Sequence, residues 1–156
     1  MRIFNVILVG VALGLIGPLA AAQASDIVKV KSSADVAATT DALEAAVTGA
    51  GATVFARVDH GAGAAKAGLE LADAQLLIFG NPKLGTPAMN EDALAGLFLP
   101  LRVLVYEDGA GEVWLAYEDP SAMLGPLEGT SADAPYLTKM TGALKKLTAA
   151  ASGAGG

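Results

Sequence analysis

Apolar and polar residues follow two periods along this chain, and together these periods predict alternating strands and helices. Five strands are predicted, at 26–31, 53–59, 76–79, 101–107 and 112–118. Those at 26–31 and 53–59 alternate with the two-residue period of a strand. Residues 76–79 are apolar without interruption, which is typical of a central strand covered on both faces. The last two strands are joined by Asp108-Gly109-Ala110-Gly111, a strong hairpin signal.

Between the strands, apolar residues recur three and four positions apart, which predicts helices with one buried stripe. The first helix is expected to begin after Ser33, its predicted N-cap, and to end at Gly49. Further helices are predicted at 62–71, 91–98 and 136–150. In the helix at 91–98, we expect Leu94, Leu97 and Phe98 to face inward.

The stretch 80–89 follows a buried strand and contains two glycines and two prolines. It is predicted to be a rigid, polar loop of the kind that often carries a site. The order β-α-β-α-β-α-β-β-α predicts an α+β (mixed α/β) fold. We expect one mixed sheet of about five strands with helices packed against it, and a C-terminal β-hairpin followed by a helix.

The N-terminus has the three parts of a secretory signal peptide. Met1-Arg2 is positively charged, 3–16 is an uncharged and mostly apolar run, and Ala22-Gln23-Ala24 has the small-x-small form of a cleavage site. The alternative is a membrane anchor, but the run is shorter than the roughly 18–20 apolar residues that a spanning helix needs. We therefore predict cleavage after Ala24 and a periplasmic or secreted protein without a stable membrane anchor.

The predicted organisation is a signal peptide at 1–24, a single domain at 25–150 and a flexible tail at 151–156. The mature chain is long enough to bury a core without disulfides, and it contains no cysteine. The formal net charge is −6 for the whole chain and becomes −7 once Arg2 leaves with the leader. An acidic domain with scattered cations has no electrostatic footprint for nucleic acid. Nucleic acid is therefore excluded as a partner.

Three blocks of residues carry a specific family resemblance when they are taken together. They are 55–60 (FARVDH) with 68–71, 79–83 (FGNPK) with 85–87, and 99–108 (LPLRVLVYED) with 113–120. In these blocks the chain resembles the domain of unknown function 302 (DUF302) family, over about residues 27–120.

The resemblance implies a compact α/β domain that is commonly a homodimer and has no established activity. The chain departs from the family pattern after Asp119-Pro120, where members often continue with Tyr-Leu and an Arg-His pair. Here the chain reads Ser-Ala-Met-Leu-Gly-Pro over 121–126. A role for that second histidine is therefore not carried over. Ala88 also stands where leucine is usual, so we expect slightly different packing of the 80–89 segment.

His60, the only histidine, is the candidate catalytic residue, with Asp59 beside it. A carboxylate next to an imidazole suits a general base that is oriented by its neighbour. The alternative is a histidine that forms local hydrogen bonds at the junction of a strand and a helix.

The candidate ligand-binding residues are Lys66, Glu70, Asn81, Lys83 and Thr86. Lys66 and Glu70 either reach across a cleft or form an ordinary helical ion pair. The Asn81 amide both donates and accepts hydrogen bonds, so it either orients a ligand or closes an Asx-type turn.

No metal site or cofactor is predicted, because one histidine, no cysteine and scattered acids give no ligand spacing. Met89, Met123 and Met140 suit Cu(I) in principle, but core packing explains them better.

Two functions remain open: a dimeric small-ligand-binding or interaction module, and an enzyme that uses His60 with nearby acidic or amide groups as general acid and base. A further hypothesis pairs the terminal hairpin edge to edge in a homodimer, because 101–106 is apolar on both faces.

Overall fold

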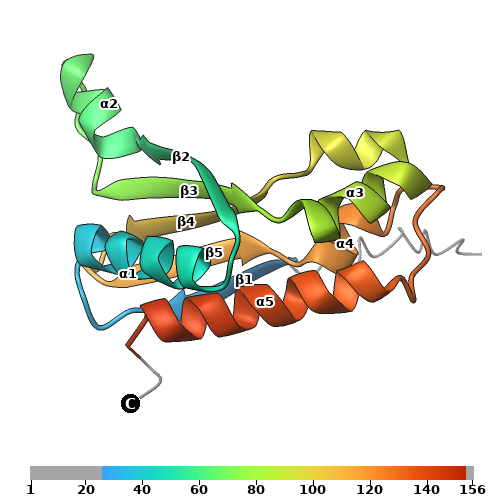
Figure 1. Cartoon of the computed structure of the whole chain (residues 1–156). Coiled ribbons are helices and arrows are strands. Elements are labelled where there is room, and N and C mark those ends of the chain that lie inside the picture. Colours follow the sequence, from blue (N-terminus) through green and yellow to red (C-terminus); the bar gives the residue numbers. More distant parts are fainter. Residues whose placement is uncertain (1–25, 154–156) are drawn as a thin grey trace, which may run out of the picture.

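A computed structural model describes residues 26–153 of the chain. The predicted signal peptide at 1–24 and the last residues of the predicted tail, 154–156, lie outside the described residues. The elements, in chain order, are β1 (Ile27–Lys31), α1 (Val36–Gly49), β2 (Thr53–Asp59), α2 (His60–Lys66), β3 (Ala74–Gly80), α3 (Pro82–Glu91), the 3₁₀ helix η1 (Ala93–Leu97), β4 (Leu101–Glu107), β5 (Val113–Glu118), α4 (Pro120–Leu124) and α5 (Pro135–Ala151) (Figure 1).

The five strands form one sheet in the order β1-β5-β4-β3-β2. The predicted α+β class, the single five-stranded sheet and the C-terminal hairpin followed by a helix are confirmed. All four strand pairings are antiparallel, so the described strands contain none of the parallel pairs of a mixed sheet. The reason lies in the connections, because each of the strands β3 to β5 returns beside the strand before it, and β1 then pairs with β5.

One face of the sheet is covered by α1 and α5, which lie on the same side of it (Figure 1). The predicted stripes of both helices are buried, as are the alternate residues of β3, β4 and β5 that point toward them. The largest fully buried side chains include Leu43, Val47, Leu77, Val103, Val105, Leu115, Leu137, Met140 and Leu144. The helical stripes in the sequence therefore identify their part of this core correctly. The prediction that 76–79 is covered on both faces is wrong, because Leu76 and Ile78 lie on the uncovered face of the sheet and are only half-buried.

The first helix is capped by Asp35 rather than by Ser33. The Asp35 carboxylate accepts a hydrogen bond from the backbone N–H of Ala38 at 2.7 Å. Ser33 instead lies near the C-terminus of α5, where its backbone N–H and its hydroxyl both donate to the carbonyl of Ser152. The packed part of the chain therefore extends to Ser152, which is buried.

The predicted helix at 91–98 is only the short 3₁₀ helix η1, and two of the three residues predicted to face inward do not; Phe98 alone packs partly against the core. Leu94 and Leu97 are 57% and 74% exposed, whereas Ala95 is fully buried. The reason is the tighter winding of a 3₁₀ helix, with three residues per turn, which turns a different face toward the core.

A β-bulge at Phe55 divides strand β2. Val54 pairs with Phe79, and Ala56 pairs with Ile78, so the extra residue between them is Phe55. Since Phe79 and Ile78 point to opposite faces, Val54 and Ala56 do so too, and the single alternation expected for 53–59 is wrong.

The terminal hairpin lies inside the sheet and not at its edge. Strand β4 is flanked by β3 and β5, and β5 is flanked by β4 and β1. Edge-to-edge pairing of this hairpin with a second chain is therefore ruled out, because the edge strands are β1 and β2.

Candidate functional site

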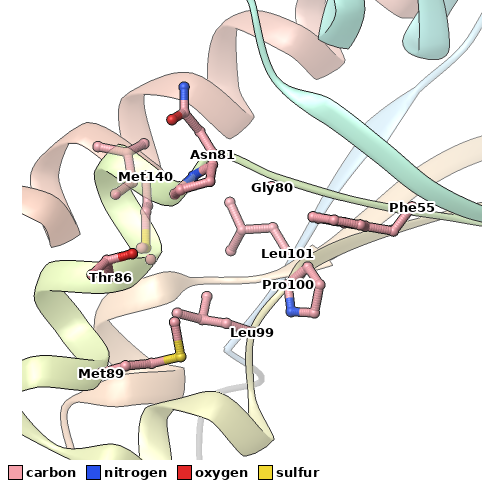
Figure 2. Close-up of a pocket in the computed structure, with 12 residues that line it drawn as sticks. Phe55, Gly80, Asn81, Thr86, Met89, Leu99, Pro100, Leu101 and Met140 are labelled. Carbon is pink, nitrogen blue, oxygen red and sulfur yellow. The ribbon is translucent and has the colours of Figure 1, made fainter.

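A cavity of about 380 Å³ opens at the end of the sheet, between α3 and the turn that leads into β4 (Figure 2). Its walls are mainly apolar, and Asn81 and Thr86 provide the polar side chains. The lining residues come from the β2 bulge, the end of β3, α3, the start of β4 and α5: Phe55, Gly80, Asn81, Pro82, Leu84, Gly85, Thr86, Met89, Leu99, Pro100, Leu101 and Met140.

The segment predicted as a rigid loop at 80–89 is in fact largely the helix α3. Asn81 caps this helix, since its side-chain oxygen accepts the backbone N–H of Lys83 at 2.9 Å. Pro82 follows at the first helical position, where its fixed φ and missing N–H cost nothing. Gly85 and Pro87 favour a loop in the sequence, but the cap and the complete burial of Ala88 outweigh them.

The far end of α3 is tied to α5 through a side-chain hydrogen bond. The Tyr136 hydroxyl donates to Oε2 of Glu91 at 2.7 Å. Burial is the main cause that raises the pKa of the Tyr136 hydroxyl, and the hydrogen bond to Glu91 is the second. The residue therefore stays a neutral donor. The helix that forms one wall of the cavity is therefore held at both ends.

The bulge in β2 places Phe55 at the mouth of the cavity. Phe55 is 57% exposed, and its ring lies over Gly80 and beside Pro100 (Figure 2). A bulge re-aims one side chain without breaking the sheet, and such features are common beside sites. Gly80 carries no side chain in this contact, so the ring approaches the strand closely.

The polar groups of the cavity differ in direction. In Figure 2 the Thr86 hydroxyl points into the ring of lining residues, whereas the Asn81 amide points out of it. The Asn81 oxygen is also occupied by the helix cap. Thr86 is therefore the side chain best placed to donate a hydrogen bond to a ligand inside the cavity.

Of the predicted ligand-binding residues, the structure brings only Asn81 and Thr86 to the cavity. Lys83 is on α3 and exposed, but its side chain is not part of the lining. Lys66 ends α2, and Glu70 follows it outside the helix. These two do not form an ion pair within residues 26–153.

The candidate catalytic residues lie at the opposite end of the β2–β3 pair from the cavity. Asp59 pairs with Gln75 at one end, and Thr53 pairs with Gly80 at the other. At about 3.4 Å per residue, the two ends are roughly 17 Å apart. Figure 1 shows the same separation, with α2 and α3 at opposite ends of the sheet. His60 and the cavity therefore do not form one site.

The local role of Asp59 is to cap α2, and the carboxylate is not turned to His60. Its Oδ1 atom accepts the backbone N–H of Ala62 at 2.7 Å, and its Oδ2 atom faces the Gln75 amide at 3.4 Å. His60 is exposed at the first position of α2. The orientation of an imidazole by a carboxylate, which a general base requires, is absent from this pair.

Several residues that line the cavity were not predicted from the sequence. Phe55 is aimed by a bulge, which the alternation of 53–59 does not reveal. Leu99, Pro100 and Leu101 read as the start of an ordinary strand, and Met140 reads as core. A proline directly before an apolar strand, as in Leu99-Pro100-Leu101, was the signal available for an irregular entry into the sheet.

Within residues 26–153, no group of three or more His, Cys, Asp or Glu side chains is placed to hold a metal ion. In the same range, no helix has the length and apolar character needed to cross a membrane.

The sequence model of the family described as "Domain of unknown function DUF302" matches residues 28–151. The chain therefore belongs to the DUF302 family. A crystal structure of an uncharacterized conserved DUF302 protein from Bacillus stearothermophilus has the same fold, with a TM-score of 0.66 and 23% sequence identity. The match covers 83% of this chain and 98% of that one.

Closer sequence similarity is found to part of some longer proteins. Over 104 residues the chain is 47% identical to the Fluoride-specific ion channel FluC 1 of Brucella suis, and likewise to FluC 1 of Brucella abortus. These matches cover 67% of this chain but only 41% and 38% of those proteins. The chain thus spans about two fifths of the length of these curated relatives.

Proposed function

We propose that this protein is an exported, dimeric module that binds a small, uncharged and mainly apolar molecule in the cavity between α3 and the turn into β4. The observation that carries the proposal is the cavity itself. Its volume of about 380 Å³ falls within the range of known small-molecule sites, and an apolar wall with few polar groups is their usual composition. The Thr86 hydroxyl supplies a hydrogen bond that fixes the ligand's orientation.

The charge of the ligand follows from the lining. Among residues 26–153, no charged side chain lines the cavity. An ionised ligand would lose its hydration there without gaining an ion pair, which costs several kcal/mol in an apolar site. The ligand is therefore expected to be neutral, such as a small aromatic compound or a short-chain ester or alcohol.

A thermal-shift screen of the mature protein against neutral aromatic and aliphatic metabolites tests the proposal. A ligand that binds the folded state raises the melting temperature by mass action, in proportion to the logarithm of its concentration. The shift should disappear in the variant Leu99→Trp, which fills the cavity, and persist in His60→Ala. A ligand whose shift survives Leu99→Trp would place binding elsewhere.

The enzyme alternative is less well supported, because His60 is far from the cavity and is not oriented by Asp59. It predicts that His60→Ala abolishes a turnover that the protein performs on a bound ligand. Unchanged turnover in His60→Ala would remove this alternative.

The export proposal rests on the leader-like sequence at 1–24. Mass spectrometry of the protein recovered from the periplasm should give Ser25 as its first residue. An intact Met1 in a soluble fraction would contradict it.

A second candidate function is association with a membrane ion channel, and the similarity to part of the Brucella channel proteins favours it. In those chains the similar segment is joined to further sequence, and such linkage holds two modules at high effective concentration. If a similar association occurs here, deleting the gene for this protein should lower the fluoride tolerance of its host. Unchanged tolerance would argue against this candidate.

A further inference from the structure

The face of the sheet opposite α1 and α5, here called the open face, is unusually apolar. The cross-strand register defines three rows on it. The central row consists of Val58, Leu76, Leu104, Ala116 and Lys29. One outer row consists of Ala56, Ile78, Arg102, Glu118 and Ile27. The other outer row consists of Ala74, Tyr106, Trp114 and Lys31.

An antiparallel sheet with one face in water normally shows polar residues on that face. Here the middle of the open face is formed by Leu76, Leu104 and Ala116, with Tyr106 and Trp114 next to them. None of these five side chains is buried. Contiguous apolar surface of this kind indicates an interface.

Charged side chains on the open face are few: Lys29 and Lys31 lie on β1, Glu118 lies on β5 and Arg102 lies on β4. Lys31 is paired with Glu112 at 2.6 Å, and Lys29 lies 5.7 Å from the centre of the Tyr106 ring. The long aliphatic stem of Lys29 lets its ammonium stay in water at the rim while the stem covers apolar surface. The five side chains at the middle of the open face are uncharged, and the charged residue next to them is Arg102, two residues from Leu104 on β4.

We propose that the open face is the surface through which a second copy of this chain binds, with the two sheets packed face to face and the two-fold axis along the central row. This proposal rests on the homodimer of the proposed function and adds the residues that form its interface. Sheets that pack in this way keep their strands roughly aligned.

The arrangement is self-complementary because the two-fold axis places each outer row of one copy against the other outer row of its partner. Arg102 and Tyr106 lie two residues either side of Leu104, so Arg102 meets the partner's Tyr106, a favourable cation–π pair. Glu118 and Trp114 likewise lie two residues either side of Ala116, so Glu118 meets the partner's Trp114. Because Lys31 pairs with Trp114 on the neighbouring strand, Glu118 also lies next to the partner's Lys31. The axis brings one pair of like charges together, Lys29 and the partner's Lys29, at the β1 rim where both ammonium groups stay in water.

The area is sufficient for a specific contact. Five strands spaced about 4.8 Å apart and about 20 Å long present roughly 500 Å² per copy. Two copies then bury about 1,000 Å², the lower limit for a specific interface. A second copy therefore suits this surface better than a small ligand, which would cover only part of it.

Light scattering and thiol cross-linking of the protein recovered after expression with its own leader test the proposal. The protein should have the mass of two chains at micromolar concentration. Leu104→Glu should reduce this to one chain, with the circular dichroism spectrum unchanged, whereas the matched control Leu97→Glu, on exposed η1, should leave two chains. Ligand binding in the cavity should persist in Leu104→Glu, so the two proposals fail separately.

Cross-linking keeps the test decisive if Leu104→Glu does not fold. The chain has no native cysteine, so one introduced thiol reports its own neighbour. A short bis-maleimide should link Ala116→Cys chains in pairs, but not chains with Ala110→Cys in the exposed hairpin turn. Single-chain mass for the unmodified protein, or pairs linked through position 110 and not 116, would overturn the proposal. A monomer that retains residues 1–24 would also overturn the proposal, because the leader would then be the segment that covers the open face.

Discussion

The ring of Phe55 lies against Gly80: a Cβ atom at Gly80 would be only 3.2 Å from Cε2 of Phe55 and 3.4 Å from Cβ of Pro100. A β-bulge on one strand and a glycine on the next thus combine to place an aromatic ring over the mouth of the cavity. The ring is largely exposed, so it is accessible to a ligand at the mouth of the cavity.

The first prediction concerns Phe55 itself. Phe55→Ala should lower the affinity for a cavity ligand by about tenfold or more, because it removes one wall, equivalent to about 1.4 kcal/mol or more. The free energy of unfolding should change by less than about 1 kcal/mol, since the side chain is mostly exposed. Calorimetric titration and chemical denaturation measure the two effects. Equal affinity loss in the control Leu69→Ala, on the exposed connection after α2, would contradict the assignment.

The second prediction separates helix stability from cavity volume. Gly85→Ala and Gly142→Ala each remove a glycine from a helix, which should stabilise the fold by up to about 1 kcal/mol. A Cβ at Gly85 fits 3.6 Å from Leu99, at the edge of the cavity, whereas a Cβ at Gly142 contacts nothing within 4 Å. Only Gly85→Ala should weaken ligand binding. A similar loss of affinity in both variants would mean that the cavity is not the site.

The third prediction distinguishes the two roles considered for Asn81. Asn81→Ala should cost about 0.5–2 kcal/mol of stability through loss of the helix cap. Asn81→Ser keeps a capping oxygen and should restore most of that stability. If the amide does not contact the ligand, affinity in Asn81→Ser should remain close to that of the unmodified protein. A selective loss of affinity in Asn81→Ser would show that the amide binds the ligand.

The fourth prediction concerns pH and the β4–β5 hairpin. The Asp108 carboxylate accepts the backbone N–H groups of Glu112 and Ala110 and the indole N–H of Trp114, the last at 2.9 Å. These bonds, that from Glu112 foremost, hold the folded-state pKa of Asp108 below its ordinary 3.8. The stabilisation is therefore fully present above that value and is lost as the pH falls through the lower folded-state pKa.

Trp114 is the only tryptophan, so its fluorescence reports this titration directly. The emission should change with a midpoint below pH 3.8, and the change should be absent in Asp108→Asn. A midpoint above pH 3.8 would contradict the hydrogen-bonded geometry.

Much of the fold is predictable from the sequence because burial in a sheet and in a helix leaves distinct periods. Val36, Leu43 and Val47 on α1, and Leu137, Met140 and Leu144 on α5, are buried as predicted. The turn at Asp108 is likewise predictable, because it depends on local side-chain bonds and on Gly111, whose φ of +77° favours glycine.

The site was only partly predictable, because its geometry depends on tertiary contacts. Whether 80–89 is a loop or a helix is decided by the Asn81 cap and by the burial of Ala88 against the core, and neither is visible in composition. The separation of His60 from Asn81 depends on the antiparallel pairing of β2 with β3. A sequence pattern places both residues after strands, but it does not show that these strand ends lie at opposite ends of the sheet.

The most direct test of the central claim is methyl NMR of the mature protein during titration with a neutral aromatic ligand found in the thermal-shift screen. The Cε methyl groups of Met89 and Met140 and the methyl groups of Leu99 line the cavity, whereas Leu104 lies on the open face. Saturable shifts at Met89, Met140 and Leu99, with none at Leu104, are the predicted result. Shifts confined to Leu104 and its neighbours, with the cavity methyl groups unmoved, would contradict a binding site between α3 and the turn into β4.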